Sequence, residues 1–359
     1  MKISRTLFDR ISPRKIDAED TILEALKRMD AIDKKLLLVF RGDTFEGILS
    51  VGDVQRAIIG NLPVTTPVGK VIRTSYLSAG INDNMESIHG IMLKQRIECM
   101  PVVDDEKNLI DVIFWEDLFP GKKKTDNIAL GLPVVIMAGG KGERLRPFTH
   151  VLPKPLFPVD EKTIIEHIID NFLEVGCTNF FISVNHKADL IKYYLQNLGK
   201  ESGDISFIQE DKPLGTAGSL YLLKGKIDKT FFVTNCDILI DQDLSKIVDY
   251  HREEGNEMTI VAALRHLKIP YGTIETGERG QLLSMVEKPE MIIKINSGFY
   301  ILEPHLLDSV PDHQFLNITD LIERVVARKG KVGVFPVSEG SWKDIGEWSE
   351  YFRVTKAGK

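Results

Sequence analysis

The sequence predicts an α/β protein in which a doubly wound mixed sheet follows a smaller α+β module. Two observations lead to this prediction. From about residue 132 onward, short apolar runs alternate with amphipathic helices, which is typical of a sheet with helices on both faces. Within the first 120 residues, one pattern of helix, strand, turn, strand and helix occurs twice. The length of 359 residues suits two or three domains of ordinary size.

The repeat in the first part of the chain is degenerate. Aligning residues 36–39 with residues 100–103 pairs Gly47 with Asp111 and Asp53 with Asp117. In each copy, apolar residues at helical spacing precede two short apolar runs. We therefore expect helices around residues 22–29 and 85–92 and strands over 36–40, 45–49, 100–103 and 110–114.

The two copies resemble a pair of CBS motifs that form one Bateman module, a fold whose cleft binds adenine nucleotides or related ligands. In that family, a Gly-x-x-Ser/Thr-x-x-Asp turn places the hydroxyl near a phosphate and the carboxylate on the ribose hydroxyls. The first copy keeps this turn and the second departs from it, with Gly47, Ser50 and Asp53 against Asp111, Phe114 and Asp117. Because a phenylalanine side chain cannot donate a hydrogen bond, the resemblance implies one adenine or guanine nucleotide site rather than two. Ser50 and Asp53 would form it, and Asp117 could still accept a bond from ribose.

Two other interpretations of this module stay open. It could serve only to dimerise or to pack against the rest of the chain. Ser50 and Asp53 could equally be the N-cap and the first-turn carboxylate of the following helix.

A polar run with chain breakers, from Pro120 to Asn127, separates the two parts of the chain. Proline, glycine and three consecutive lysines are typical of an exposed connector. We therefore expect the repeat module over residues 1–120, a linker over 121–131 and the larger domain over 132–359.

A basic, glycine-rich loop follows the first apolar run of the larger domain. Residues 134–136 are predicted to form a buried strand, and an amphipathic helix is expected over residues 164–173. Glycines and basic side chains gather between them: Gly139, Gly140, Gly142, Lys141, Arg144, Arg146 and Lys154. Glycines let backbone N–H groups close on an anion, and the basic side chains make this loop positive in a chain of formal net charge −6.

Two common phosphate-binding motifs do not fit this loop. A Walker A loop needs Ser or Thr directly after its lysine, whereas Lys141 is followed by Gly142. No reading frame places Gly at all three positions of the Rossmann dinucleotide fingerprint.

The run over residues 137–156 instead resembles the signature of the sugar-1-phosphate nucleotidylyltransferases, because Arg144, Pro147, Thr149 and Lys154 follow the glycines in order. In that family, the run forms the loop over the nucleoside triphosphate in a Rossmann-like, doubly wound domain. The resemblance therefore implies catalytic roles for Arg144 and Lys154. It also implies nucleotide contacts from Ala138, Gly139, Gly140 and Gly142.

Two aspartates are candidate metal ligands. Asp237 comes after the buried apolar run 231–234, and a carboxylate at the carboxyl end of a strand is well placed to hold Mg²⁺ against phosphate oxygens. The resemblance identifies Asp237 as the family's catalytic metal aspartate and Asp344 as the second. Carboxylates from these distant segments could share one or two Mg²⁺ ions.

The segment over residues 210–218 resembles the loop that reads the base in this family, which implies nucleotide contacts from Glu210, Pro213, Gly215 and Thr216. Guanine presents two adjacent donors on its pairing edge, and these suit the acceptor-only carboxylate of Glu210. Uracil and thymine present an acceptor beside a donor, which suits the amide of Gln. The residue type therefore favours GTP over UTP or dTTP. The alternative is that Glu210 faces solvent and that Gln209 or backbone groups read the base.

The sugar side of the family's site is matched by three short motifs, Tyr-Gly, Glu-Lys-Pro and Asn-Ser-Gly, in the family's order. The resemblance implies that Gly272, Glu287 and Asn296 bond sugar hydroxyls and that Lys288 holds the sugar phosphate. The arrangement of both parts is similar to the CBS-containing guanylyltransferases that make GDP-glucosamine for legionaminic-acid-type sugars in bacteria. Mannose- or heptose-1-phosphate guanylyltransfer would use the same motifs. A non-catalytic nucleotide-sensing subunit is the rival from another class.

Composition limits the remaining function classes. The first 15 residues contain no apolar signal segment, and no run approaches the roughly 18 apolar residues of a membrane span, so we expect a cytoplasmic protein. The acidic balance argues against a nucleic-acid partner. The three cysteines, Cys99, Cys177 and Cys236, lack metal-binding spacing and are expected to be buried apolar residues. We also expect a homodimer.

Overall fold

The structure is a computed structural model that describes residues 10–73, 75–95, 99–106, 108–114, 129–199 and 202–357. The chain divides into two compact units between Asp126 and Asn127. Asp117 lies outside the described residues, as does the helix expected after the last strand of the second repeat.

The first unit contains two small sheets of the same design, which confirms the predicted repeat. In each sheet a parallel pair is followed by an antiparallel pair, in the order β1-β2-β3 and β4-β5-β6. The strands are β1 (Lys15–Asp17), β2 (Leu36–Arg41), β3 (Thr44–Ser50), β4 (Ala79–Gly80), β5 (Cys99–Val103) and β6 (Leu109–Phe114). The helices are α2 (Ile22–Ala31), α3 (Val51–Ile59) and α4 (Met85–Gln95). Apolar residues of both sheets, among them Phe40, Cys99 and Phe114, pack in one shared core.

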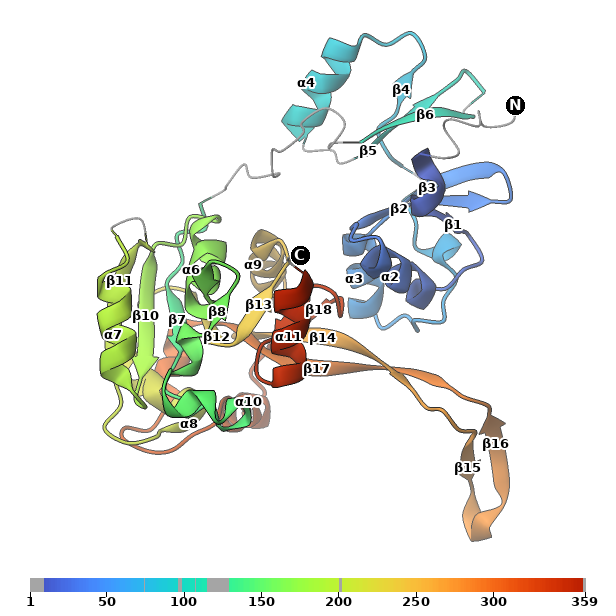
Figure 1. Ribbon diagram of the computed structural model, residues 1–359. Helices are drawn as coiled ribbons and strands as arrows, with labels where there is room; N and C mark the ends of the chain where they lie inside the picture. The colour runs from blue at the N-terminus through green and yellow to red at the C-terminus, as the bar shows by residue number, and fades with distance from the viewer. Residues whose placement is uncertain are drawn as a thin grey trace. The chain divides into compact units, whose positions relative to one another are not determined.

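The second unit is built on a mixed sheet whose strand order, in the described residues, is β11-β10-β7-β12-β17-β14-β18 (Figure 1). Its strands are β7 (Val134–Met137), β10 (Asn179–Val184), β11 (Asp204–Gln209), β12 (Phe231–Asn235), β14 (Met258–Lys268), β17 (Glu290–Leu302) and β18 (Val332–Val337). Strand β17 runs antiparallel to its neighbours β12 and β14, whereas the other pairs are parallel. The predicted mixed sheet is therefore confirmed.

Helices cover both faces of this sheet, as a doubly wound fold requires. Because side chains alternate along a strand, Val134 and Ile136 of β7 enter one apolar core, whereas Val135 and Met137 enter the other. The first core includes residues of α6 (Ile164–Leu173), α7 (Ala188–Gln196) and α9 (Leu244–Glu253). The second includes residues of α8 (Gly215–Gly218) and α10 (Ile318–Ala327).

A two-stranded ribbon leaves this sheet. The outer halves of β14 and β17 continue past the rest of the sheet and carry the hairpin of β15 (Thr273–Thr276) and β16 (Leu282–Val286) at their end (Figure 1). Among the remaining elements, β8 (Pro158–Val159) pairs with β9 (Lys162–Thr163), β13 (Ile238–Ile240) pairs with β19 (Trp342–Asp344), and α11 spans Trp348–Ala357.

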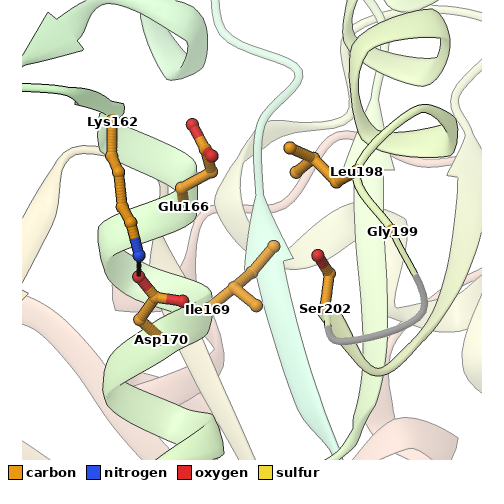
Figure 2. A pocket seen from close by; sticks show the side chains of 7 residues that line it. All are labelled: Lys162, Glu166, Ile169, Asp170, Leu198, Gly199 and Ser202. Atoms are coloured by element: carbon orange, nitrogen blue, oxygen red, sulfur yellow. Dashed lines mark hydrogen bonds and ion pairs between the residues drawn. The ribbon is translucent and has the colours of Figure 1, made fainter.

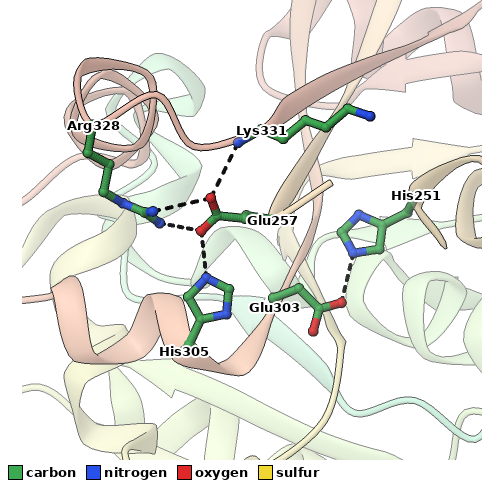
Figure 3. A network of polar contacts seen from close by, with 6 residues as sticks. All are labelled: His251, Glu257, Glu303, His305, Arg328 and Lys331. Carbon is green, nitrogen blue, oxygen red and sulfur yellow. Dashed lines mark hydrogen bonds and ion pairs between the residues drawn. The ribbon is translucent and has the colours of Figure 1, made fainter. Parts of the chain in front are cut away.

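A polar network fixes the start of β14. Glu257, one residue before the strand, accepts hydrogen bonds from Arg328, from His305 Nε2 (2.6 Å) and from the backbone N–H of Lys331 (3.3 Å) (Figure 3). Hydrogen bonds from Arg328 and then from His305 lower the pKa of Glu257 to about 2. The network therefore joins the end of α10, the start of β18 and the start of β14.

Candidate functional site

A pocket of about 330 Å³ lies where the predicted site residues converge. It is bordered by the ends of β12 and β19, by the middle of β17 and by the start of α10. Its lining includes the sequence-predicted residues Arg144, Thr216, Asp237, Asn296 and Asp344. Segments that lie up to 200 residues apart in the sequence thus meet at the carboxyl ends of the parallel strands. Doubly wound folds bind their ligands at this end of the sheet.

Lys154 and Asp237 form a hydrogen-bonded ion pair beside this pocket. The ammonium group of Lys154 donates to Asp237 Oδ2, and both side chains are almost fully buried. Pro153 fixes an extended backbone before a short 3-10 turn over Lys154–Leu156, which directs the lysine inward. The signature loop is therefore attached to the end of β12 by this buried charge pair.

The two aspartates meet through a long-range strand pair. Ile238, directly after Asp237, faces Asp344 in the antiparallel pairing of β13 with β19, and the backbone N–H of Ile345 donates to the carbonyl of Asp237 (2.9 Å). Burial and then the negative charge of Asp237 raise the pKa of Asp344, although Lys154 and Arg144 partly oppose this shift. The backbone therefore holds two like charges close together.

The donor set of these aspartates fits a divalent cation. Within the described part of the chain, Oδ1 of Asp237 and Oδ1 of Asp344 are buried and lack a hydrogen-bond partner. A buried carboxylate oxygen without a hydrogen-bond partner destabilises the folded protein, and carboxylate oxygens are ligands that Mg²⁺ prefers. Asp237 and Asp344 are therefore suited to hold Mg²⁺ against phosphate.

Arg144 lies at the open side of the pocket. Its side chain is 58% exposed and its Nη1 is 3.3 Å from Glu347 Oε1. Gly346 leaves room for the guanidinium, because a Cβ there would lie 2.9 Å from Arg144 Nη2 and 2.5 Å from Asp344 Oδ1. An exposed guanidinium next to the two aspartates can turn toward an incoming triphosphate.

The glycine loop is shaped by close contacts at two positions. Gly142 has φ of +62° and a Cβ there would lie 2.9 Å from Thr149 Cγ2, so the turn requires glycine. A Cβ on Gly139 would lie 3.1 Å from Glu210 Oε1, whereas one on Gly140 would meet no atom within 4 Å. The backbone N–H of Ala138 is already bonded to the carbonyl of Ser183 (2.8 Å), so this N–H is not free for a nucleotide.

Glu210 is buried, so the interpretation that its side chain faces solvent is wrong. The residue is 6% exposed. Its Oε1 accepts from the hydroxyl of Ser183 (2.6 Å), and its Oε2 accepts from the backbone N–H of Leu214 (3.1 Å). A carboxylate has about four lone-pair positions, so two bonds leave acceptor capacity beside Gly139.

The loop after Glu210 is attached to the segment that precedes α10. The carbonyl of Leu316 accepts from the backbone N–H groups of Ala217 (2.9 Å) and Gly218 (3.0 Å). Gly215 has φ of +77° and approaches the same carbonyl closely. The hydroxyl of Thr216 accepts from the N–H of Ile318 (2.9 Å) and lines the pocket, whereas Pro213 is exposed outside it.

The residues predicted for the sugar side are separated. Asn296 lies in the pocket, where its Oδ1 accepts from the N–H of Gly298 (3.1 Å). Gly272, Glu287 and Lys288 lie together near the outer hairpin, since a Cβ on Gly272 would be 3.0 Å from Glu287 Oε2. The side chains of Glu287 and Lys288 are 66% and 70% exposed. The structure therefore does not bring these three residues to Asn296.

Sequence reasoning missed several polar residues of the pocket. Its lining also includes Asn235, Ser297, Tyr300, Asn317 and Trp342. Asn235 is the last residue of β12, directly before Cys236. A polar residue at the carboxyl end of a strand is a candidate for ligand binding, so this position was the sequence signal that could have identified it. Tyr300 had no such signal, because it lies within an apolar strand, and burial raises its pKa to about 12.

In the first unit, Ser50 and Asp53 form a capping box at the start of α3. Ser50 accepts from the N–H of Asp53 (3.3 Å), and Asp53 accepts from the N–H of Ser50 (2.8 Å). The carboxylate of Asp53 also pairs with Arg56 and Arg73. Burial acts to raise the pKa of Asp53, but hydrogen bonds from Ser50 and the charge of Arg73 outweigh it and lower the pKa. The helix-capping interpretation of these residues is therefore confirmed.

The second repeat is arranged differently at the equivalent positions. Asp111 pairs with Arg10 (3.3 Å), and the guanidinium of Arg14 lies 4.1 Å from the ring centre of Phe114. The phenylalanine that replaces the expected hydroxyl is thus covered by a cation.

A second cavity, of about 420 Å³, lies between α6 and residues that follow α7, namely Leu198, Gly199 and Ser202 (Figure 2). Its charged side chains already have partners, since Lys162 donates to Asp170 Oδ2 (2.6 Å) and Glu166 accepts from Tyr194 (2.6 Å). Among its described lining residues, none has a buried polar side-chain atom without a hydrogen-bond partner, in contrast to the first pocket.

Comparison with known proteins agrees with this division of the chain. A family model described as nucleotidyl transferase matches residues 133–358, and one described as CBS domain matches residues 68–120. In the described residues, no helix is both long and apolar enough to cross a membrane.

The curated relatives of this chain include a guanylyltransferase and a uridylyltransferase. A probable mannose-1-phosphate guanylyltransferase 1 from Oryza sativa subsp. japonica is 32% identical over 228 residues, which are 61% of this chain and 63% of that protein. A UTP–glucose-1-phosphate uridylyltransferase from Synechocystis sp. is 31% identical over 245 residues, which are 63% of each chain. The chain thus spans less than two thirds of the length of these relatives. A solved structure of HddC from Yersinia pseudotuberculosis, complexed with GMP-PN, has a TM-score of 0.51 at 24% identity and covers 64% of this chain and 100% of that chain.

Proposed function

The chain belongs to the nucleotidyl transferase family, and on that premise we propose that it transfers a nucleoside monophosphate from a nucleoside triphosphate to a sugar 1-phosphate, with release of pyrophosphate. The observation that carries this proposal is the buried Lys154–Asp237 pair beside the pocket, together with the Oδ1 atoms of Asp237 and Asp344, which have no hydrogen-bond partner among the described residues. This arrangement suits two anionic substrates and a divalent cation.

The proposed mechanism needs no covalent intermediate. An oxygen of the sugar phosphate attacks the α-phosphorus in line, the bond to the β-phosphate oxygen breaks, and pyrophosphate leaves. Because a sugar phosphate is ionised at neutral pH, no general base is required. Two unit charges about 4 Å apart repel by about 4 kcal/mol at an effective dielectric of about 20, so cations must lie where the substrates meet.

This chain's own residues supply that positive charge. Arg144 would neutralise the triphosphate, and Lys154 would face the reacting phosphate from its buried position. Mg²⁺ held by Asp237 and Asp344 would polarise the phosphate oxygens. The N–H groups around Gly140 are well suited to approach the triphosphate, because no described residue other than its chain neighbours has an atom within 4 Å of a Cβ there.

We propose GTP as the preferred nucleotide. The buried carboxylate of Glu210 would accept from the two adjacent donors of guanine, and the relative from Oryza sativa is named as a guanylyltransferase. The relative from Synechocystis is named as a uridylyltransferase, so UTP or dTTP is the alternative. The proposed sugar is glucosamine 1-phosphate, with mannose 1-phosphate or a heptose 1-phosphate as alternatives.

The proposed regulatory ligand of the first unit is an adenine or guanine nucleotide at Ser50 and Asp53. Since both side chains are engaged in the capping box of α3, binding would have to exchange some of these bonds for bonds to the ligand. A non-catalytic sensor is the second candidate function, and the intact Lys154, Asp237 and Asp344 speak against it.

The experiment that tests this function is pyrophosphate release with Mg²⁺ across GTP, UTP, dTTP, CTP and ATP. Each nucleotide is paired with glucosamine 1-phosphate, glucose 1-phosphate and mannose 1-phosphate. Turnover with GTP alone supports the role of Glu210, and turnover with UTP or dTTP overturns it. An Asp237→Asn variant should be inactive in every combination. Silence of the wild-type protein, with and without added adenine nucleotide, would favour the sensor.

A further inference from the structure

Helix α11 contacts the signature loop, the segment over residues 137–156, through its first residue. The indole Nε1 of Trp348 donates to the carbonyl of Arg146 (3.3 Å), across 202 positions of the chain. The rings of Trp348 and Phe148 meet edge to face, with their centres 5.2 Å apart. A polar and an aromatic contact therefore attach the loop to α11.

The part of the loop that Trp348 contacts is exposed. Leu145 and Thr149 are only 0% and 3% exposed, whereas residues 146–148 between them are exposed. Phe148 is 63% exposed, although its ring lies against Trp348. Because an exposed turn has little buried apolar area to limit its motion, contacts from a neighbouring helix restrict it where the core does not.

Trp348 itself is held by the core of the second unit. Its ring centre lies 6.3 Å from that of the buried Phe157, and its side chain packs against the apolar core. One turn further along α11, the hydroxyl of Tyr351 donates to the carbonyl of Pro158 (2.7 Å). Trp348 thus connects a buried ring, that of Phe157, to the exposed turn of the loop.

The segment that leads into α11 also carries a candidate metal ligand. Residues 344–348 begin with Asp344 and end with Trp348. Between them, Glu347 Oε1 lies 3.3 Å from Arg144 Nη1. A triphosphate that reaches both the cation at Asp344 and the guanidinium of Arg144 needs a fixed separation between them. This short segment, which contacts the loop at Glu347 and Trp348, helps to set that separation.

We propose that Trp348 is a positioning residue that holds the signature loop in the conformation that binds the triphosphate. This inference rests on the proposed function, because Arg144 and the backbone around Gly140 are proposed to contact the triphosphate. Trp348 would act through the loop and not on the substrate. The loop would contact the triphosphate both before and during the reaction, so a loosened loop should weaken its binding and leave kcat little changed.

Trp348→Phe and Trp348→Ala test this role in the full-length protein. Phenylalanine keeps an aromatic ring but loses the bond to Arg146, and alanine loses both contacts. In pyrophosphate release with Mg²⁺, the KM for GTP should rise about 3- to 10-fold in Trp348→Phe and at least about 10-fold in Trp348→Ala. The kcat and the KM for the sugar 1-phosphate should change by less than about twofold.

Tyr351→Phe is the matched control, because it removes the other hydrogen bond from an aromatic side chain of α11 to a backbone carbonyl. Both phenylalanine variants should lower Tm slightly and by similar amounts, but only Trp348→Phe should raise the KM for GTP. An equal rise in both variants would show that α11 acts only through the stability of the domain. An unchanged KM in Trp348→Ala would exclude the positioning role.

Hydrogen exchange gives a readout that does not depend on activity. The backbone N–H groups of residues 150–152 donate to the carbonyls of Pro147 and Phe148. Exchange in a peptide over residues 145–152 should be at least about fivefold faster in Trp348→Ala than in the wild type, with exchange in α6 unchanged. Equal exchange in both proteins would refute the proposal. A wild type without turnover would refute the proposed function, and exchange would still decide whether Trp348 holds the loop.

Discussion

Lys154 and Asp237 are 83 positions apart in the chain and form an ion pair with 8% and 14% of their side chains exposed. Burial removes water from a charged group, so a buried charge destabilises the protein unless an oppositely charged partner lies next to it. The pair therefore links the signature loop to the end of β12 and also keeps an ammonium group ready beside the pocket.

Replacing Lys154 by Met should destabilise the second unit and abolish turnover. Asp237 would keep a buried charge without its cation, and breaking such a pair costs roughly 3–5 kcal/mol. Urea unfolding measures the loss of stability, and pyrophosphate release measures the loss of activity.

The double variant Lys154→Met/Asp237→Asn is the control for this prediction. It removes both charges, so most of the lost stability should return while the protein stays inactive. A double variant as unstable as Lys154→Met alone would show that the ion pair is not the source of the effect.

Asp344→Asn should separate stability from function. Burial and the charge of Asp237 raise the pKa of Asp344, which means that the ionised form is disfavoured in the folded protein without metal. The metal-free variant should therefore be at least as stable as the wild type. Its activity should be lost, and added MgCl₂ should no longer raise its Tm. Asp189→Asn, on α7, should keep the Mg²⁺-dependent rise, and a rise retained in Asp344→Asn would exclude Asp344 as a ligand.

Local patterns were enough to predict several elements of the second unit. Strands β7 and β12 have uninterrupted apolar runs and helix α6 has strong periodicity, and all three were expected where they occur. The contact between Asp237 and Asp344 was not predictable in this way, because it depends on the pairing of β13 with β19 across a long stretch of chain. A family resemblance supplied it instead.

The two-stranded ribbon formed by the outer halves of β14 and β17 shows where local patterns fail. Tyr-Gly and Glu-Lys-Pro predicted substrate contacts by resemblance, but nothing local indicates that a strand continues beyond its sheet. Likewise, the type of Glu210 suggested base recognition, whereas its bonds to Ser183 and Leu214 depend on the tertiary fold. The types and the order of these residues suggested the chemistry of the site, whereas long-range packing determined where each residue lies.

Glu210→Gln should change the preferred base. An amide presents one acceptor and one donor, so it would lose one of the two bonds that a carboxylate makes with guanine. Hydrogen bonds to charged groups contribute about 1.5–3 kcal/mol, so kcat/KM with GTP should fall by about 10- to 100-fold. Activity with UTP or dTTP should rise relative to GTP. Steady-state kinetics with each triphosphate measures this ratio, and an unchanged ratio would exclude Glu210 from base recognition.

Ser50→Gly should distinguish a ligand hydroxyl from a helix cap. Glycine replaces a capping serine at a cost of only a few tenths of a kcal/mol, so α3 should persist and Tm should barely change. If the hydroxyl of Ser50 also contacts a phosphate, calorimetry on the full-length protein should show at least about tenfold weaker binding of ATP or GTP. Equal affinity in both proteins would leave Ser50 with its capping role alone.

Glu257→Gln should remove a pH-dependent part of the stability. The pKa of Glu257 falls from 4.5 to about 2 on folding because Arg328 and His305 bond to its carboxylate. A lowered folded-state pKa stabilises the protein above the unfolded pKa, and this contribution is lost as the pH falls from 4.5 toward 2. This change of pKa implies roughly 3 kcal/mol, and screening by solvent reduces it, so urea unfolding at pH 6 should show the variant to be less stable by about 2 kcal/mol. This difference should shrink steadily between about pH 4.5 and 3.5. Glu253→Gln, an exposed position on α9, should show no such trend, and a difference that is constant with pH would mean that the Glu257 carboxylate does not stabilise the start of β14 through its charge.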